Sequence, residues 1–291
     1  MRFHSSFGGR VFQGLALGLA ILVLAGLLVG CQQSAQTGGS TTTTTAGADD
    51  KVYVYIPCGM REPFDHAVKM FNESHPGIPV KAYYDNAVVL VRKIKGGDRP
   101  DLMISPGEIE MKALIDAGIV APEAVTPIGT YTLALIAPRE NPAAVKTVQD
   151  LTKPAVRSIA IGEPTQNSVG YYARQSLEKL GLWEKVKGKV VFPEHALDVI
   201  SFAAMKKVDA VLAYETCPLQ SAPEKASKDR LIILGVIPAE MHSPIMVKVG
   251  VLKESKYPER AAEFAKFLTT EAIQAEFQQT GLPRLSNLQS Q

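Results

Sequence analysis

Residues 52–77 read VYVYIPCGMREPFDHAVKMFNESHPG and contain a strand and a helix in direct succession. Residues 52–56 are a short apolar run, which is typical of a buried strand. Phe64 and Phe71 then lie two helical turns apart, and His75-Pro76-Gly77 ends the helix. This strand–helix unit predicts an α/β fold.

The same alternation of strand and helix continues along the rest of the chain. Short apolar runs predict further strands, and helix-length amphipathic segments lie between them. A long apolar strand stands at each edge of the middle segment, which indicates two crossings between two lobes. The predicted strands cover residues 80–84, 102–105, 131–137, 158–161, 208–214 and 245–252.

We therefore predict an α/β fold with two lobes, each a mainly parallel sheet flanked by helices, joined by two crossover strands. The chain from residue 51 onward is long enough for two such lobes. Residues 51–130 form the first part of lobe 1, and residues 131–244 form lobe 2. Residues 245–291 return as a crossover strand and the second part of lobe 1.

The N-terminal region carries the pattern of a lipoprotein signal. Two arginines are followed by an uncharged apolar segment, residues 11–29, and by Gly30 directly before Cys31. We predict that residues 1–30 are a signal peptide and that Cys31 becomes the lipidated first residue. Residues 31–50, rich in Ser, Thr and Gly, form a flexible tether. The alternative is an ordinary transmembrane anchor, which leaves a cysteine at its polar edge unexplained.

The charge of the mature chain is close to zero. The full sequence has 31 Lys and Arg residues against 29 Asp and Glu residues. Residues 1–30 contain two of the basic residues and no acidic residue, so 29 of each sign remain. We expect no nucleic acid as partner, because nucleic-acid-binding surfaces are basic. The mature protein would work on the periplasmic or extracytoplasmic face of a membrane, held there by its lipid.

Six short motifs are spread over the predicted lobes. They are YIPCGM at 55–60, RKIKGG at 92–97, RPDLMIS at 99–105, GEP at 162–164, GYYA at 170–173 and LEKLGLW at 177–183. In this order and spacing they resemble the molybdate-binding proteins of ABC importers, which belong to the type II periplasmic binding protein superfamily. The resemblance covers the chain from about residue 51 to residue 284.

The resemblance implies a solute-binding component of an ABC importer. Two lobes would close on a small oxyanion of the molybdate or tungstate type in the cleft between them. The sequence has no glycine-rich phosphate loop of the Walker type, so a permease with separate ATPase subunits would receive the ligand. We expect a monomer without a cofactor and without catalytic residues.

The oxyanion site of that family, carried over residue by residue, is only partly kept. Two family serines fall on Gly59 and Ala87, so both hydroxyl groups are missing. The family's backbone donors fall on Ala87, Val169 and Ala196, and its ligand tyrosine falls on Tyr214. The resemblance therefore implies a ligand held mainly by backbone N–H groups, as at helix N-termini.

Other side chains in the same predicted loops are candidates for the site. Asn86, Asn167 or Ser168 could replace the missing hydroxyl groups. Cys58 follows the first strand and could contact the ligand through its thiol, or it could be a small buried side chain.

The cysteines leave a second kind of ligand open. Cys58 and Cys217 stand near the predicted cleft and, together with His195, could bind a thiophilic metal ion or metal complex. No Cys-x-x-Cys or His-x-x-x-His spacing supports such a site. The two cysteines could also form a disulfide outside the cytoplasm, which would restrain opening of the cleft.

Two other functions remain as alternatives to an importer component. A tethered sensor would bind the same ligand and report to a membrane receptor. A thiol enzyme would use Cys58 as nucleophile and His195 as base. These two residues stand on different predicted lobes and would separate whenever the cleft opened, and no signature motif surrounds the cysteine. We therefore expect a binding protein.

Overall fold

The computed structural model describes residues 50–285, apart from residues 78, 194 and 218–227. These residues belong to one compact unit, Thr45–Gln291. The predicted signal peptide, Cys31 and nearly all of the predicted tether lie outside the described residues. None of the helices in the described part of the chain has the length and apolar character needed to span a bilayer.

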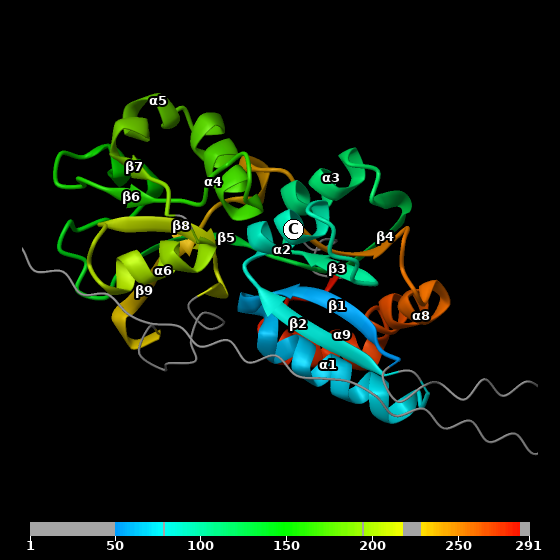
Figure 1. Ribbon diagram of the computed structural model, residues 1–291. Helices are drawn as coiled ribbons and strands as arrows, with labels where there is room; N and C mark the ends of the chain where they lie inside the picture. Colours follow the sequence, from blue (N-terminus) through cyan, green and yellow to red (C-terminus); the bar gives the residue numbers. More distant parts are fainter. Residues whose placement is uncertain (1–49, 78, 194, 218–227, 286–291) are drawn as a thin grey trace, which may run out of the picture. The chain divides into compact units, whose positions relative to one another are not determined.

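Lobe 1 is built on a five-stranded mixed sheet with the strand order β2-β1-β3-β10-β4 (Figure 1). In this sheet β2, β1 and β3 run parallel, whereas β10 is antiparallel to both β3 and β4. The strands are β1 (Val52–Pro57), β2 (Val80–Asp85), β3 (Leu102–Ser105), β4 (Val120–Thr130) and β10 (Met246–Leu252).

Five helices cover the first sheet, with α1 and α9 on one side and α2 and α3 on the other (Figure 1). The aromatic side chains of α1 explain its position, because Phe64 and Phe71 are fully buried. Phe64 packs on Phe277 of α9, with ring centroids 5.3 Å apart. The helices are α1 (Arg61–Ser74), α2 (Ala87–Lys95), α3 (Glu108–Asp116), α8 (Pro258–Phe267) and α9 (Glu271–Gln279).

Lobe 2 has a second five-stranded sheet with the order β7-β6-β8-β5-β9. Its strands are β5 (Leu133–Pro138), β6 (Ile159–Ala160), β7 (Val190–Val191), β8 (Ala210–Tyr214) and β9 (Leu231–Val236). The helices α4 (Ser168–Lys179) and α6 (Ala196–Ala204) both pack on β8, which is buried along its whole length, and α5 (Trp183–Val186) follows α4. The 3₁₀ segments are η1 (Cys58–Met60), η2 (Val148–Thr152), η3 (Lys187–Lys189), η4 (Lys228–Arg230) and η5 (Ala239–Met241).

The chain passes between the sheets twice, from β4 to β5 and from β9 to β10. The two links touch, since the Tyr131 N–H donates a hydrogen bond to the Ile245 carbonyl at 3.1 Å. The prediction of two α/β lobes with two crossings is confirmed. Each sheet is mixed, where the sequence predicts mainly parallel sheets, because the strands next to the crossings (β4, β5, β9 and β10) pair antiparallel.

A buried carboxylate joins the two lobes. Glu110 of α3 is 1 % exposed and accepts a hydrogen bond from the Ser168 N–H, the first residue of α4, at 3.0 Å. The Ser168 hydroxyl also donates to Glu110, and this hydroxyl accepts from the Ile109 N–H at 2.9 Å. A negative charge at a helix N-terminus is favourable, because the peptide dipoles place positive potential there. Burial raises the pKa of Glu110, and its hydrogen bonds with Ser168 oppose the increase.

Gly107 allows the lobes to approach this closely. A Cβ atom at Gly107 would lie 2.5 Å from the Ser168 Cβ and 3.0 Å from the Tyr172 ring. Side-chain carbons do not pack at 2.5 Å, so any larger residue here would push α4 away from α3. The short distance between Gly107 and the start of α4 therefore depends on the absence of a side chain at residue 107.

Replacing Glu110 by Ala should lower the free energy of unfolding by about 1–3 kcal/mol, because buried N–H and O–H donors of lobe 2 lose their acceptor. Urea denaturation measures this change. Glu108→Ala on the same helix is the control: Glu108 pairs with Lys248 near the surface, and such pairs contribute about 0–1 kcal/mol. Equal effects of the two substitutions would contradict a special role for Glu110.

Candidate ligand-binding site

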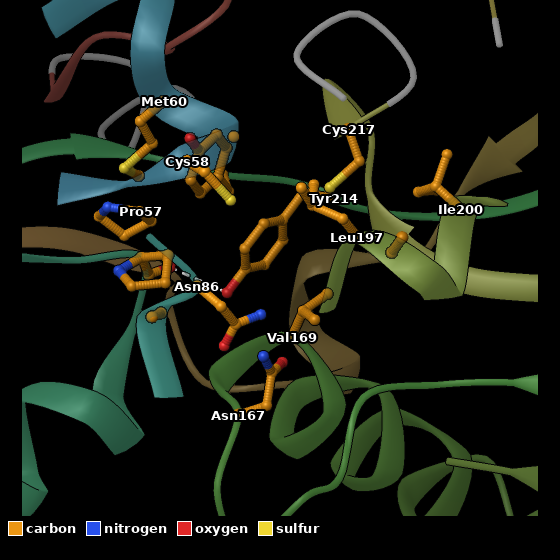
Figure 2. A pocket seen from close by; sticks show the side chains of 15 residues that line it. Pro57, Cys58, Met60, Asn86, Asn167, Val169, Leu197, Ile200, Tyr214 and Cys217 are labelled. Atoms are coloured by element: carbon orange, nitrogen blue, oxygen red, sulfur yellow. Dashed lines mark hydrogen bonds between the residues drawn. The ribbon is translucent and has the colours of Figure 1, made fainter. Parts of the chain in front are cut away.

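A cavity of about 80 Å³ is lined by residues of both lobes. Lobe 1 contributes the end of β1, η1, the start of α2 and the turn after β3, and lobe 2 contributes the starts of α4 and α6 and the end of β8. Figure 2 shows the Tyr214 side chain reaching into the space between these elements. The lining residues are Pro57, Cys58, Gly59, Met60, Asn86, Ala87, Pro106, Tyr131, Asn167, Val169, Leu197, Ile200, Ala213, Tyr214 and Cys217.

Helix N-termini from both lobes meet at this cavity. Asn86 precedes α2, Asn167 precedes α4, and Leu197 lies in the first turn of α6. Within the described residues, no group accepts a hydrogen bond from the N–H of Ala87 or of Val169. The first N–H groups of a helix have no partner inside the helix, so they are available to a ligand.

The two asparagines cap these helices with their side chains. Asn86 Oδ1 accepts from the Val88 N–H at 2.9 Å, and Asn167 Oδ1 accepts from the Gly170 N–H at 3.2 Å. Asn is among the preferred N-cap residues, because its oxygen satisfies an N–H of the first helical turn. Asn86 is 6 % exposed and Asn167 is 5 % exposed.

Tyr214 connects the lobes across the cavity. Its hydroxyl donates to the Pro106 carbonyl of lobe 1 at 2.9 Å. Its ring stacks on Tyr131, with centroids 4.4 Å apart and an interplanar angle of 13°. Burial raises the pKa of Tyr214, and the nearby Glu110 raises it further. The phenol is therefore a neutral hydrogen-bonding group.

The two predicted cysteines both line the cavity, one from each lobe (Figure 2). The structure contains them as thiols and not as the disulfide that the sequence left open. Burial raises the pKa of Cys217 to about 12. Burial also raises the pKa of Cys58, although the N–H groups of Gly59 and of Cys58 itself oppose the increase.

The structure brings together most of the residues singled out in the sequence, but not all of them. Cys58, Gly59, Asn86, Ala87, Val169, Tyr214 and Cys217 line one cavity, and so does Asn167.

Ser168 and His195 lie elsewhere. The Ser168 hydroxyl is engaged by Glu110 and Ile109 and is absent from the lining. His195 is exposed before α6, and Ala196 begins that helix. Among the described residues, no three His, Cys, Asp or Glu side chains gather as a metal site.

Several lining residues are absent from the sequence prediction. Met60, Pro106, Tyr131, Leu197 and Ile200 are ordinary apolar or aromatic residues beside the predicted loops. Met60 and Leu197 have one signal, which is that they flank the chosen residues Gly59 and Ala196, and the other three have none. Which of them face the cavity depends on how the two lobes meet.

The sequence profile of a family described as "Bacterial extracellular solute-binding protein" matches residues 52–282, which is most of the chain. The chain belongs to this family. Membership confirms the prediction of a solute-binding protein and not an enzyme.

Curated relatives and solved structures agree with this membership. The chain is 27 % identical over 273 residues to the "Putative ABC transporter substrate-binding lipoprotein YvgL" of Bacillus subtilis, covering 93 % of this chain and 98 % of that protein. It is 24 % identical over 231 residues to the molybdate-binding protein ModA of Haemophilus influenzae, covering 77 % and 87 %. The periplasmic molybdate-binding protein of Azotobacter vinelandii has the same fold, with a TM-score of 0.62, 18 % identity and coverage of 80 % and 98 %.

In the folded solute-binding protein, Cys217 should react with iodoacetamide at pH 8 about a thousandfold more slowly than in the unfolded chain. An increase of the pKa from 9.0 to about 12 lowers the fraction of reactive thiolate by this factor. Time-resolved labelling with peptide mass spectrometry measures the rate at each cysteine, and protein in guanidinium chloride is the control. Labelling of folded Cys217 at the unfolded rate would contradict the raised pKa of its thiol.

Proposed function

We propose that the chain is a lipid-anchored solute-binding component of an ABC importer and captures a small oxyanion of the molybdate or tungstate type. The observation that carries this proposal is the meeting of helix N-termini from both lobes at one small cavity. N–H groups and helix dipoles at such positions favour negative charge.

The chemistry of the lining supports an anion over a cation. Among the described residues that line the cavity there is no Asp, Glu, Lys, Arg or His. A hard cation would need carboxylate and carbonyl oxygens in place of these groups. An anion can instead be held by oriented N–H dipoles, which stabilise it without a positively charged side chain.

The size of the cavity supports a ligand of a few heavy atoms. Its volume is about 80 Å³, whereas pockets for drug-sized ligands have volumes of roughly 300–1,000 Å³. A tetrahedral oxyanion suits this space, and a sugar or peptide would need a much wider opening of the lobes.

The role at the membrane rests on the sequence and on the names of relatives. Residues 1–30 and Cys31 carry the lipoprotein pattern, and the similar YvgL is named a lipoprotein of an ABC transporter. The partners that we propose are a permease with separate ATPase subunits, with the protein acting as a monomer on the extracytoplasmic face. A tethered sensor would use the same cavity and the same ligand.

The thiophilic metal remains a second candidate for one reason, which is that Cys58 and Cys217 line the cavity from opposite lobes. The position of His195 outside the lining argues against it. So does the burial that raises the pKa of both thiols, because metals bind the thiolate form.

Molybdate or tungstate should raise the melting temperature of the purified protein, and phosphate and thiophilic metal ions should not. Binding to the folded state alone stabilises it by about 2.7 kcal/mol at a hundredfold excess over Kd. Phosphate carries a proton near neutral pH, and the lining residues that the structure describes include no carboxylate to accept it. Differential scanning fluorimetry under reducing conditions compares these ligands and sulfate. Stabilisation by a metal ion alone, lost in Cys58→Ser, would replace the oxyanion by the metal.

Tyr214→Phe should weaken oxyanion binding about tenfold, because the hydroxyl proton that Tyr214 donates to the Pro106 carbonyl in this structure would be donated to the oxyanion when the ligand binds. A hydrogen bond that contributes about 1.5 kcal/mol corresponds to this factor. Isothermal titration calorimetry measures the Kd. Tyr84→Phe is the matched control, since the Tyr84 hydroxyl donates to Asp65 and Tyr84 does not line the cavity. An unchanged Kd in Tyr214→Phe would remove Tyr214 from the site.

A further inference from the structure

The caps of α2 and α4 fix the direction of two buried amide groups. In each asparagine the Oδ1 atom must face the N–H that it caps, at Val88 or at Gly170. An asparagine amide has one acceptor atom and one NH₂ donor, and its hydrogen bonds decide which is which. The NH₂ groups of Asn86 and Asn167 therefore point away from the helix backbone.

These two NH₂ groups have no acceptor among the described residues. Both side chains are more than nine-tenths buried, and both line the cavity. Figure 2 shows them reaching toward the same space from opposite lobes, near the Tyr214 hydroxyl. Neither nitrogen is fully buried, so each NH₂ group is open to an acceptor from solvent or from a ligand in the cavity.

We propose that the side-chain NH₂ groups of Asn86 and Asn167 donate hydrogen bonds directly to the bound oxyanion, one from each lobe. This inference rests on the proposed oxyanion function. It assigns donors to a site in which the two serine hydroxyls expected from the resemblance are missing at Gly59 and Ala87.

The two caps prepare these donors for the ligand. Each amide is already held by its helix before the ligand arrives, so little side-chain freedom is lost on binding. Because one donor comes from α2 and the other from α4, a ligand that uses both bridges the lobes. The asparagines would thereby contribute to affinity and to closure at the same time.

Substitution by Gly separates this role from helix capping. Replacing an N-cap Asn by Gly destabilises the helix much less than replacing it by Ala, and Gly has neither a side-chain donor nor a charge. Asp keeps the capping oxygen and replaces the donor with a negative charge. That charge repels an anion in either case, so the Gly variants are the decisive ones. If the asparagines only cap their helices, the Gly variants should bind the oxyanion like the wild type.

The experiment is calorimetric titration of the purified protein with molybdate and with sulfate. Asn86→Gly and Asn167→Gly should each raise the Kd about tenfold or more, and the Asp variants should raise it further. Asn141→Gly is the matched control: Asn141 caps a turn with Oδ1 on the Val145 N–H at 3.0 Å and does not line the cavity. Its Kd should equal that of the wild type.

The outcomes separate this inference from the proposed function. If the wild type binds the oxyanion and the Gly variants have a Kd within twofold of the wild-type value, the asparagine assignment is overturned and the oxyanion function stands. Absence of molybdate and sulfate binding in the wild type would overturn both. Melting temperatures of all variants establish that each of them is folded.

Discussion

The buried contact between Glu110 and the start of α4 is the constraint on which the site depends. It fixes the position of lobe 2 relative to lobe 1. The buried carboxylate accepts one hydrogen bond from the Ser168 N–H and one from the Ser168 hydroxyl, which leaves these two groups little freedom to move. Gly107 permits the approach, and Asn167 and Val169 are the neighbours of Ser168 on either side in the chain. The donors of α4 thus reach the cavity as a consequence of this one interlobe contact.

The sequence predicts the fold well where hydrophobic periodicity is strong. β1 and α1 follow directly from it, since alternating and helical spacing of apolar residues reflect which face is buried. The strand β4 escapes prediction because Pro122 and Pro127 interrupt its pattern. It lies at the edge of its sheet, where a proline loses no ladder hydrogen bond. The strand β9, at the edge of the second sheet, is also absent from the sequence prediction. The place of an edge strand is set by its pairing with the neighbouring strand, here β5.

The candidate site is predictable as a set of loops, but not as a set of side-chain directions. Loops at the ends of strands gather at one place in open α/β sheets, so most of the chosen residues line one cavity. Asn167 and Ser168 are both good capping residues, and sequence cannot say which one caps. The answer depends on Glu110, 58 positions away along the chain. Its carboxylate accepts the hydrogen bond of the Ser168 hydroxyl, so Asn167 caps the helix and lines the cavity.

The part of the cavity lining that the structure describes contains no charged side chain, and this has a consequence for the loaded protein as a whole. Residues 31–291 contain 29 basic and 29 acidic residues, and dipoles hold an anion without neutralising it. A bound dianion would then add its full charge to a protein whose net charge is close to zero. Empty and loaded forms would migrate differently in an electric field, and a docking partner could distinguish them by this charge before any movement of the lobes.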